Sequence, residues 1–290
     1  MNPKPLSRKA HRRPFIDACR GFCVLGMILF HALYILRMHN LVAVDLWNVF
    51  WWWFARLFAA AFVGLSGWSL AAKRASLTAA ADAAATVPGA ATPSTSLVLW
   101  RTPLRRALKL GLLAAAISLV TRLLFGPTSF VFFGVLHLLC LSGLLGWPLA
   151  ARPRLAAVVG ALTLAAGLLL GKQHFNGLAL AWLGFRPAGH QPMDYLPLLP
   201  WFAWTAFGSV AFHLGRRFAP RPAAVAAAVP AAAAAAATTA ATARPAPAIP
   251  SRRIPAPAAG LVWLGRHSLA VYLTHVPLLY GLAQLLVRLR

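Results

Sequence analysis

The chain has 290 residues, of which 60% are hydrophobic and 11% are charged, and its mean hydropathy is +0.70. This composition excludes an ordinary soluble globular protein, in which apolar residues make up about half of the sequence. The formal net charge of +24 does not indicate a nucleic-acid-binding protein, because the basic residues gather at the ends of apolar stretches, as they do in membrane proteins.

The apolar stretches predict an all-α fold, a polytopic transmembrane helical bundle of about seven spans in a single domain over residues 1–290. Each stretch is close to the length that a tilted helix needs to cross a bilayer. Irregular backbone cannot face lipid, which leaves a helical bundle as the architecture. The expected spans are Phe15–Leu36, Leu46–Ala71, Leu104–Leu124, Phe130–Leu149, Leu155–Gly171, Leu196–Arg217 and Gly260–Val287.

Two ionisable residues, Arg20 and His31, lie inside the first span, where such groups are costly and usually face the protein interior. Eleven positions at about 100° each make three turns plus about 20°, so both residues lie on one face, roughly 16 Å apart along the axis. An imidazole can accept a proton near neutral pH, and a guanidinium can hold a phosphate with paired donors. The spacing predicts a buried reaction centre. The alternatives are a hydrogen bond from His31 to a neighbouring helix and a structural ion pair between Arg20 and Asp17.

The second span carries aromatic residues at 51–54, typical of a membrane interface, and small residues at Gly64, Ser66 and Gly67. Small residues allow helices to approach closely, and they can also line a ligand channel. The sequence does not separate these two roles.

Two low-complexity segments, 79–96 and 220–257, are predicted as loops rich in alanine and proline. The basic residues before the first span and in the second, fourth and sixth loops fall on one side of the membrane, which should be the cytoplasm. We therefore expect a cytoplasmic N-terminus and two cytoplasmic low-complexity loops. An eighth span within 220–257 is the alternative, and it would invert the C-terminus.

The later spans bring polar groups into the outer half of the bundle. His137 lies near the start of the fourth span, and Asp194 and Trp201 lie around the start of the sixth. An acid at position 194 could orient His31 or bind an incoming amine or hydroxyl. The alternative for Asp194 is a solvated loop residue.

The last span carries a polar stripe. Ser268, Tyr272 and His275 fall within about 140° of His267 at helical pitch, and such a stripe must face protein or water. Arg266 and His267 lie near the cytoplasmic end, where they could join the arginine of the first span around an anionic ligand. An ordinary interface anchor is the alternative for Arg266.

Metal and nucleotide sites have no support in the sequence, and we expect no metal. The cysteines, Cys19, Cys23 and Cys140, have no His or Cys partner at ligand spacing. No P-loop, GxGxxG, HExxH or GxSxG motif is present.

Several segments together resemble a family of transmembrane acyltransferases. They are Ile16–Gly21 with the spacing from Arg20 to His31, Phe62–Gly67, Phe133–His137, Asp194–Trp201 and Gly265–Pro277. In their order and spacing they are similar to bacterial relatives of the catalytic domain of heparan-α-glucosaminide N-acetyltransferase, the group called domain of unknown function 1624. The spacing from Arg to His is also like that of the acyltransferase-3 family. The resemblance covers most of the chain outside the two low-complexity loops.

The resemblance implies an acetyl-CoA-dependent N- or O-acetyltransferase of the bacterial inner membrane. It would move an acyl group from cytoplasmic acyl-CoA to an amine or hydroxyl, expected to belong to a sugar. His31 would be the catalytic histidine, and Arg20 would contact the acyl donor, with Arg266 and His267 as further donor-binding candidates. In the human-type enzymes the catalytic histidine lies after the first span, so His39 stays open as the alternative base.

On the acceptor side we expect Asp194 to assist catalysis and five residues to bind substrate: Ser66, His137, Trp201, Tyr272 and His275. The expected partners are membrane lipid and a small glycan or lipid-linked acceptor, with a homodimer left open. A proton-coupled transporter or flippase is the alternative function, because buried Arg and His on one face also fit such a carrier. A structural membrane scaffold is a third class.

Overall fold

The structure is a computed structural model, and it describes residues 14–85, 95–171, 173, 175, 177–185, 189, 194–218 and 256–289. Every regular element among these residues is a helix, which confirms the predicted all-α fold. The helices are α1 (Pro14–Met38), α2 (Val49–Ala85), α3 (Thr95–Phe125), α4 (Val135–Leu149), α5 (Pro153–Leu170), α6 (Leu198–Phe218), α8 (Ala256–Arg266) and α9 (Ser268–Arg288).

Five of the described helices are long and apolar enough to cross a membrane: α1, α2, the part of α3 from Leu99 onward, α5 and α9. Helix α4 is a shorter apolar helix. Several leucines on these helices, among them Leu112 and Leu119 on α3 and Leu162 on α5, are more than half exposed. Such surfaces are costly in water and suit a lipid environment. The chain is therefore an integral membrane protein.

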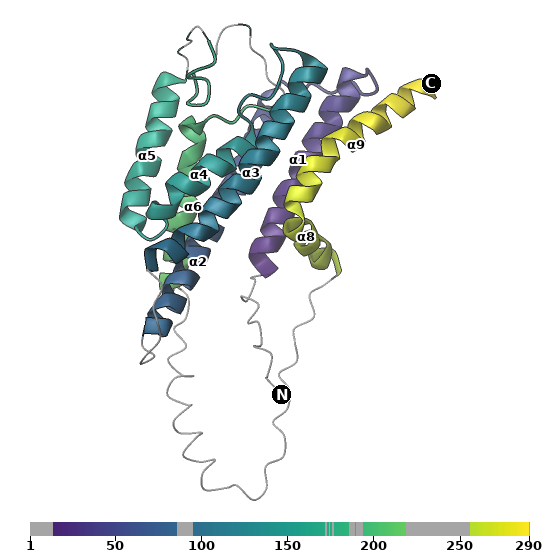
Figure 1. Ribbon diagram of the computed structural model, residues 1–290. Coiled ribbons are helices and arrows are strands. Elements are labelled where there is room, and N and C mark those ends of the chain that lie inside the picture. Colours follow the sequence, from purple (N-terminus) through teal and green to yellow (C-terminus); the bar gives the residue numbers. More distant parts are fainter. Residues whose placement is uncertain are drawn as a thin grey trace, which may run out of the picture.

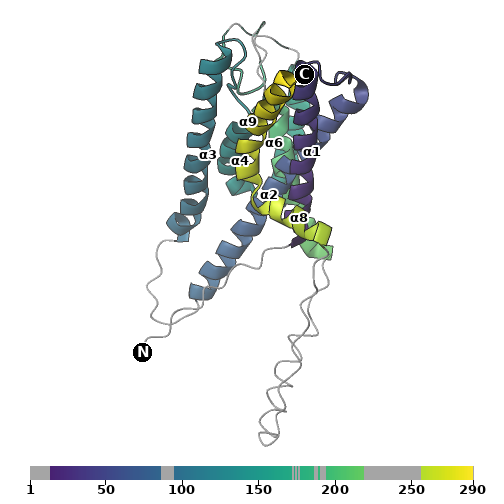
Figure 2. The ribbon, with the colours of Figure 1, turned by 90° about the vertical axis from the view of Figure 1, so that its right-hand side faces the viewer.

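The prediction of one continuous helix over Gly260–Val287 is wrong. The helix breaks at His267, where φ is −103° and ψ is 14°, so α8 ends at Arg266 and α9 begins at Ser268. Figures 1 and 2 show α9 alongside α1, and α8 lying across the N-terminal end of α1.

The bend is held by close backbone contacts between α1 and α8. A Cβ atom on Gly21 would overlap the carbonyl oxygen of Leu261, and one on Gly265 would overlap the carbonyl oxygen of Asp17. Only glycine permits so close an approach. These contacts seat the end of α8 on the start of α1 and thereby bring Arg266 to the Asp17 side chain.

Two other predicted boundaries also differ. The fourth span begins at Val135 rather than Phe130, because the preceding loop ends in an extended Gly134 (φ −98°, ψ −169°). Helix α2 continues to Ala85, into the segment 79–96 that the sequence predicts as a loop. Residues 86–94 and 219–255, including most of the segment in which an eighth span is the alternative, lie outside the described residues.

The two glycines of the second span pack α2 against α6. A Cβ atom on Gly67 would overlap the carbonyl oxygen of Thr205, and one on Gly208 would overlap the carbonyl oxygen of Gly64. Their role is therefore close helix packing. The neighbouring Ser66 is buried and its hydroxyl meets an arginine of α3 instead.

Candidate functional site

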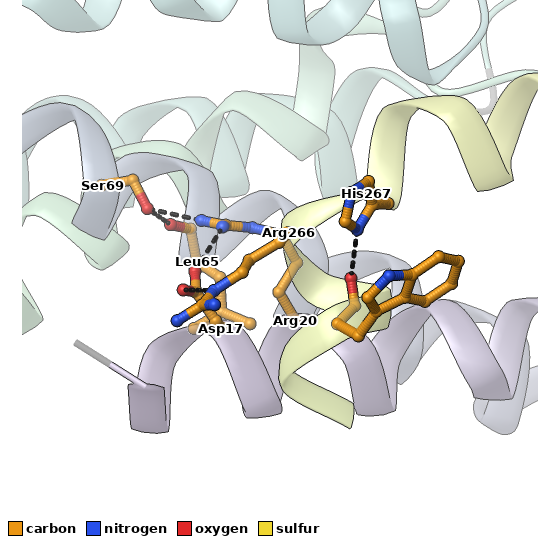
Figure 3. A network of polar contacts seen from close by, with 7 residues as sticks. Asp17, Arg20, Leu65, Ser69, Arg266 and His267 are labelled. Atoms are coloured by element: carbon orange, nitrogen blue, oxygen red, sulfur yellow. Dashed lines mark hydrogen bonds and ion pairs between the residues drawn. The ribbon is translucent and has the colours of Figure 1, made fainter. Parts of the chain in front are cut away.

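The first polar cluster lies where α1, α2 and α8 meet (Figure 3). Asp17 accepts hydrogen bonds from two arginines, from Arg20 Nη1 at 3.5 Å and from Arg266 Nε at 3.3 Å. The other terminal nitrogen of Arg20 donates to Ser69 Oγ at 2.6 Å, and Ser69 in turn donates to the Leu65 carbonyl at 2.8 Å. The cluster confirms that Arg20 faces the protein interior, with 19% of its side chain exposed.

A third arginine reaches the same place from α3. Arg106 Nη2 donates to Ser66 Oγ at 3.2 Å, and Ser66 lies one helical turn before Ser69 on α2. Ser66 and Ser69 thus bring Arg106 and Arg20 to neighbouring positions on α2. We call these residues the arginine cluster: Asp17, Ser66, Ser69, Arg20, Arg106 and Arg266.

The arginine cluster has an excess of positive charge. It holds three guanidinium groups and one carboxylate: Arg20 and Arg266 pair with the two oxygens of Asp17, and Arg106 is bonded to Ser66 instead. Guanidinium groups bind phosphate oxygens with paired, charge-assisted hydrogen bonds. The arrangement therefore suits a ligand that carries several phosphate oxygens.

His267 is not brought to this cluster. Its Nδ1 donates to the Trp263 carbonyl at 2.9 Å, and its ring lies 4.5 Å from the Trp263 ring. Figure 3 shows it turned away from Arg20 and Asp17. A role for His267 in binding the donor stays a prediction that no contact of the described residues supports.

The second polar cluster is a pair of histidines between α1 and α9. His31 Nδ1 and His275 Nε2 are 2.8 Å apart. His275 Nδ1 faces two backbone carbonyls, those of Val271 at 3.0 Å and Tyr272 at 2.9 Å. A carbonyl oxygen only accepts, so His275 carries its hydrogen on Nδ1 and its Nε2 accepts from His31 Nδ1.

This chain of hydrogen bonds fixes the tautomer of His31. With its hydrogen on Nδ1, a neutral His31 has its lone pair on Nε2. Within the part of the chain that the structure describes, His31 Nε2 meets no hydrogen-bond donor. The ring is thus held by its partner while the other nitrogen stays available to accept a proton.

Asp194 lies near the histidine pair, but among the described residues it makes no hydrogen bond to either ring. Its Oδ2 accepts from the Tyr272 hydroxyl at 2.9 Å and from the Val135 backbone N–H at 3.0 Å, and a Cβ atom on Gly134 would overlap it. Burial raises the pKa of this loop carboxyl, and the two donors lower it in turn. Asp194 therefore ties the start of α4 to α9 and, through Tyr272, helps to hold the turn that carries His275.

His137 is fully engaged in holding the loop before α4. The Gly134 N–H donates to its Nδ1 at 3.3 Å, which leaves its Nε2–H to donate to Ser118 Oγ at 3.2 Å. Ser118 in turn donates to the Val131 carbonyl at 2.6 Å. Trp201 packs on the apolar core between α4, α5 and α6. The structure does not bring either residue to the histidine pair, and their substrate-binding roles stay predictions.

His39, the alternative base, uses both ring nitrogens. Its Nδ1 donates to the Ile35 carbonyl at 2.9 Å, so its Nε2 accepts from the Gln284 amide at 3.1 Å. It lies eight residues beyond His31, directly after the last residue of α1. Among the described residues, both ring nitrogens of His39 are thus engaged whereas only one nitrogen of His31 is, and the choice of the base stays a prediction.

A cavity of about 740 Å³ lies between α1, α2 and α6, and Leu261 of α8 also lines it. Its walls are apolar, and on α1 they include Phe22, about 200° around the helix from Arg20. No residue of the arginine cluster or of the histidine pair lines it.

The sequence alone does not identify Arg106 and Ser69 as members of the arginine cluster. Arg106 falls inside the predicted span Leu104–Leu124 but is not singled out there, and α3, which begins at Thr95, carries it within a helix. A usable signal is present, because two serines three residues apart on α2 need a polar partner when they are buried in a membrane.

A comparison with protein families matches residues 12–243 to the family described as heparan-alpha-glucosaminide N-acetyltransferase, catalytic. The chain belongs to this family. The match confirms the resemblance seen in the sequence. Searches of curated proteins and of solved structures found no match.

Membership of the heparan-α-glucosaminide N-acetyltransferase family implies a membrane acetyltransferase that takes acetyl-CoA as donor and an amine as acceptor. The match ends before α8 and α9. These two helices nevertheless supply Arg266 to the arginine cluster and His275 to the histidine pair.

Proposed function

We propose that this protein transfers the acetyl group of acetyl-CoA to the amine of an amino sugar, with His31 as the base. The observation that carries the proposal is the hydrogen bond between His31 and His275, which leaves His31 Nε2 ready to accept a proton. Family membership supports the reaction type, and the two polar clusters on one side of α1 supply the residues.

The arginine cluster is proposed to hold the phosphates of the donor. Coenzyme A carries a diphosphate and a further phosphate, and the cluster offers three guanidinium groups with only one carboxylate between them. Acetyl-CoA supplies the acetyl group as an activated thioester. Arg20 and His31 lie on one face of α1, about 16 Å apart along the axis, so a long donor held at the arginines can extend toward the histidines.

His31 is proposed to act as general base and then as general acid. Its Nε2 accepts a proton from the amine as the amine nitrogen bonds to the acetyl carbon. It returns the proton to the sulfur as the carbon–sulfur bond breaks. While His31 is protonated, its Nδ1–H still donates to His275 Nε2, which stabilises the charged ring. His275 is thus a positioning residue.

The end of α1 that holds the arginine cluster is proposed to face the cytoplasm of a bacterial cell. Basic residues of other helices gather at the same end, among them Lys73 and Arg74 on α2, Arg105 on α3 and Arg216 on α6. An excess of Lys and Arg marks the cytoplasmic side of membrane proteins. The acceptor would then reach His31 from the opposite side.

The proposal is tested with the purified protein, labelled acetyl-CoA and glucosamine. The expected product is N-acetylglucosamine, identified by mass spectrometry, together with free coenzyme A. Absence of acetylated glucosamine, combined with uptake of glucosamine into proteoliposomes that does not depend on acetyl-CoA, would instead support the transporter.

A further inference from the structure

A further arginine lies toward the same end of the bundle as the arginine cluster, but on another side of α2. The guanidinium carbon of Arg74 lies over the Trp147 ring of α4, 5.0 Å from the ring centroid. Arg74 Nη1 also donates to the Trp147 carbonyl at 3.4 Å. Arg74 is five residues after Ser69, which places it about 140° around α2 from the serine that binds Arg20. The proposed chemistry does not use Arg74 or Trp147.

Two N–H groups of this pair are buried without an acceptor. Trp147 is 1% exposed, and its Nε1 atom has no hydrogen-bond partner among the described residues. The same holds for Arg74 Nε, which is also buried. Both atoms can only donate. Buried polar groups are nearly always paired with protein, water or a ligand, because an unpaired one is costly. The pair therefore lacks an acceptor.

Positive charge gathers around the pair. Arg152 is exposed and lies in the turn after α4, five residues beyond Trp147. Arg216 of α6 lies over the Phe212 ring at 5.9 Å, and Phe212 belongs to the same apolar cluster as Trp147. The ion pairs among the described residues are all made by Asp17 with other arginines. An acceptor that completes this site should therefore carry negative charge.

A phosphate group matches this set of donors. Guanidinium groups bind phosphate oxygens with charge-assisted hydrogen bonds, and a further oxygen of the same phosphate can accept from an indole N–H. A water molecule also accepts from N–H groups, but it leaves the charge of the arginines uncompensated. Anionic phospholipids attract Lys and Arg at the cytoplasmic surface of a membrane, so the phosphate can belong to a lipid headgroup or be free in solution.

We propose that Arg74 and the Trp147 Nε1–H group, with Arg152 and Arg216 around them, bind a phosphate group where α2, α4 and α6 meet. This site is separate from the arginine cluster, and it does not depend on the proposed acetyltransferase function. The bound phosphate joins donors from different helices at one end of the bundle, so its binding stabilises the folded protein.

The test measures the melting temperature of the purified protein in detergent in two titrations. The first adds inorganic phosphate at constant ionic strength. The second adds phosphatidylglycerol, with the same amount of phosphatidylcholine, which has no net charge, as the reference. Binding raises the melting temperature with ligand concentration and yields an affinity. Phosphatidylglycerol should stabilise wild type if the phosphate belongs to a lipid, and inorganic phosphate should do so if it is free.

Variants assign the effect to this site. Arg74→Gln should weaken binding of the stabilising ligand about 10- to 100-fold, the effect of a hydrogen bond to a charged group. Trp147→Phe keeps an aromatic ring but removes the N–H group, and it should weaken binding at least about fivefold. Lys73→Gln is the matched control, because Lys73 is an exposed cation directly before Arg74 on α2, and it should leave the affinity unchanged.

Three results would overturn the proposal. The first is no stabilisation of wild type in either titration, and the second is an unchanged affinity in Trp147→Phe. The third is an effect that is lost in Arg106→Gln but kept in Arg74→Gln, because it would assign the phosphate to the arginine cluster. Trp147→Phe changes no charge, so it decides between a specific site and general charge attraction even if Arg74→Gln fails to fold.

Discussion

The Nδ1 atom of His31 and the Nε2 atom of His275 lie 2.8 Å apart and join the first helix of the chain to the last. Residues 244 positions apart are thereby brought together between α1 and α9, which run side by side (Figure 1). Because the carbonyls of Val271 and Tyr272 fix the hydrogen of His275, the tautomer of His31 follows from backbone geometry. The predictions below depend on this relationship and on the arginine cluster.

Replacing His275 by Phe should slow the reaction without weakening donor binding. The variant keeps a ring in place but removes the acceptor that orients His31, so kcat should fall by about 100-fold, within the range of general-base effects. The KM for acetyl-CoA should change less than about twofold, because the phosphates are held elsewhere. An unchanged kcat in His275→Phe, with the protein folded by size-exclusion chromatography, would show that His275 does not position the base.

Replacing Arg106 by Gln should weaken acetyl-CoA binding. The variant removes the one cation of the arginine cluster that is bonded to Ser66 rather than to Asp17, and a hydrogen bond to a charged group is worth about 10- to 100-fold in affinity. Thermal stabilisation by acetyl-CoA measures this loss directly. Arg154→Gln is the control, since Arg154 is an exposed cation at the start of α5. Equal losses in the two variants would mean that only general charge attraction is involved.

Replacing Gly265 by Ala should destabilise the protein and impair donor binding together. The added Cβ overlaps the Asp17 carbonyl, so α8 must move away from α1, at a cost of about 1 to 3 kcal/mol for overpacking. Arg266 then loses its place beside Asp17. Gly281→Ala on α9, where a Cβ meets nothing within 4 Å, should be neutral or slightly stabilising. Melting temperatures in detergent check both, and a Gly265→Ala protein as stable as wild type would contradict the packing argument.

The sequence predicts those features of the site that depend on a single helix. Helical periodicity places Arg20 and His31 on one face, and the cost of polar groups in lipid turns that face inward. Family resemblance adds the acetyl donor. The Arg266 side chain is also predicted near the cytoplasmic end, and the structure brings it to Asp17.

The features that the sequence does not predict depend on contacts between helices. Periodicity puts His275 on a polar stripe but does not reveal that its partner is His31. No proline marks the break at His267 in the sequence. The break goes with the packing of Gly265 on α1, which is a contact between helices. Arg106 is missed for a related reason: its partner Ser66 lies on another helix, 40 positions away.

The most direct test of the central claim is the initial rate of acetyl transfer from acetyl-CoA to glucosamine for wild type, His31→Ala and His39→Ala. The structure predicts a loss of at least about 100-fold for His31→Ala, with retained thermal stabilisation by acetyl-CoA, and a near-normal rate for His39→Ala. Full activity of His31→Ala, or loss of activity in His39→Ala alone, would contradict the assignment of His31 as the base.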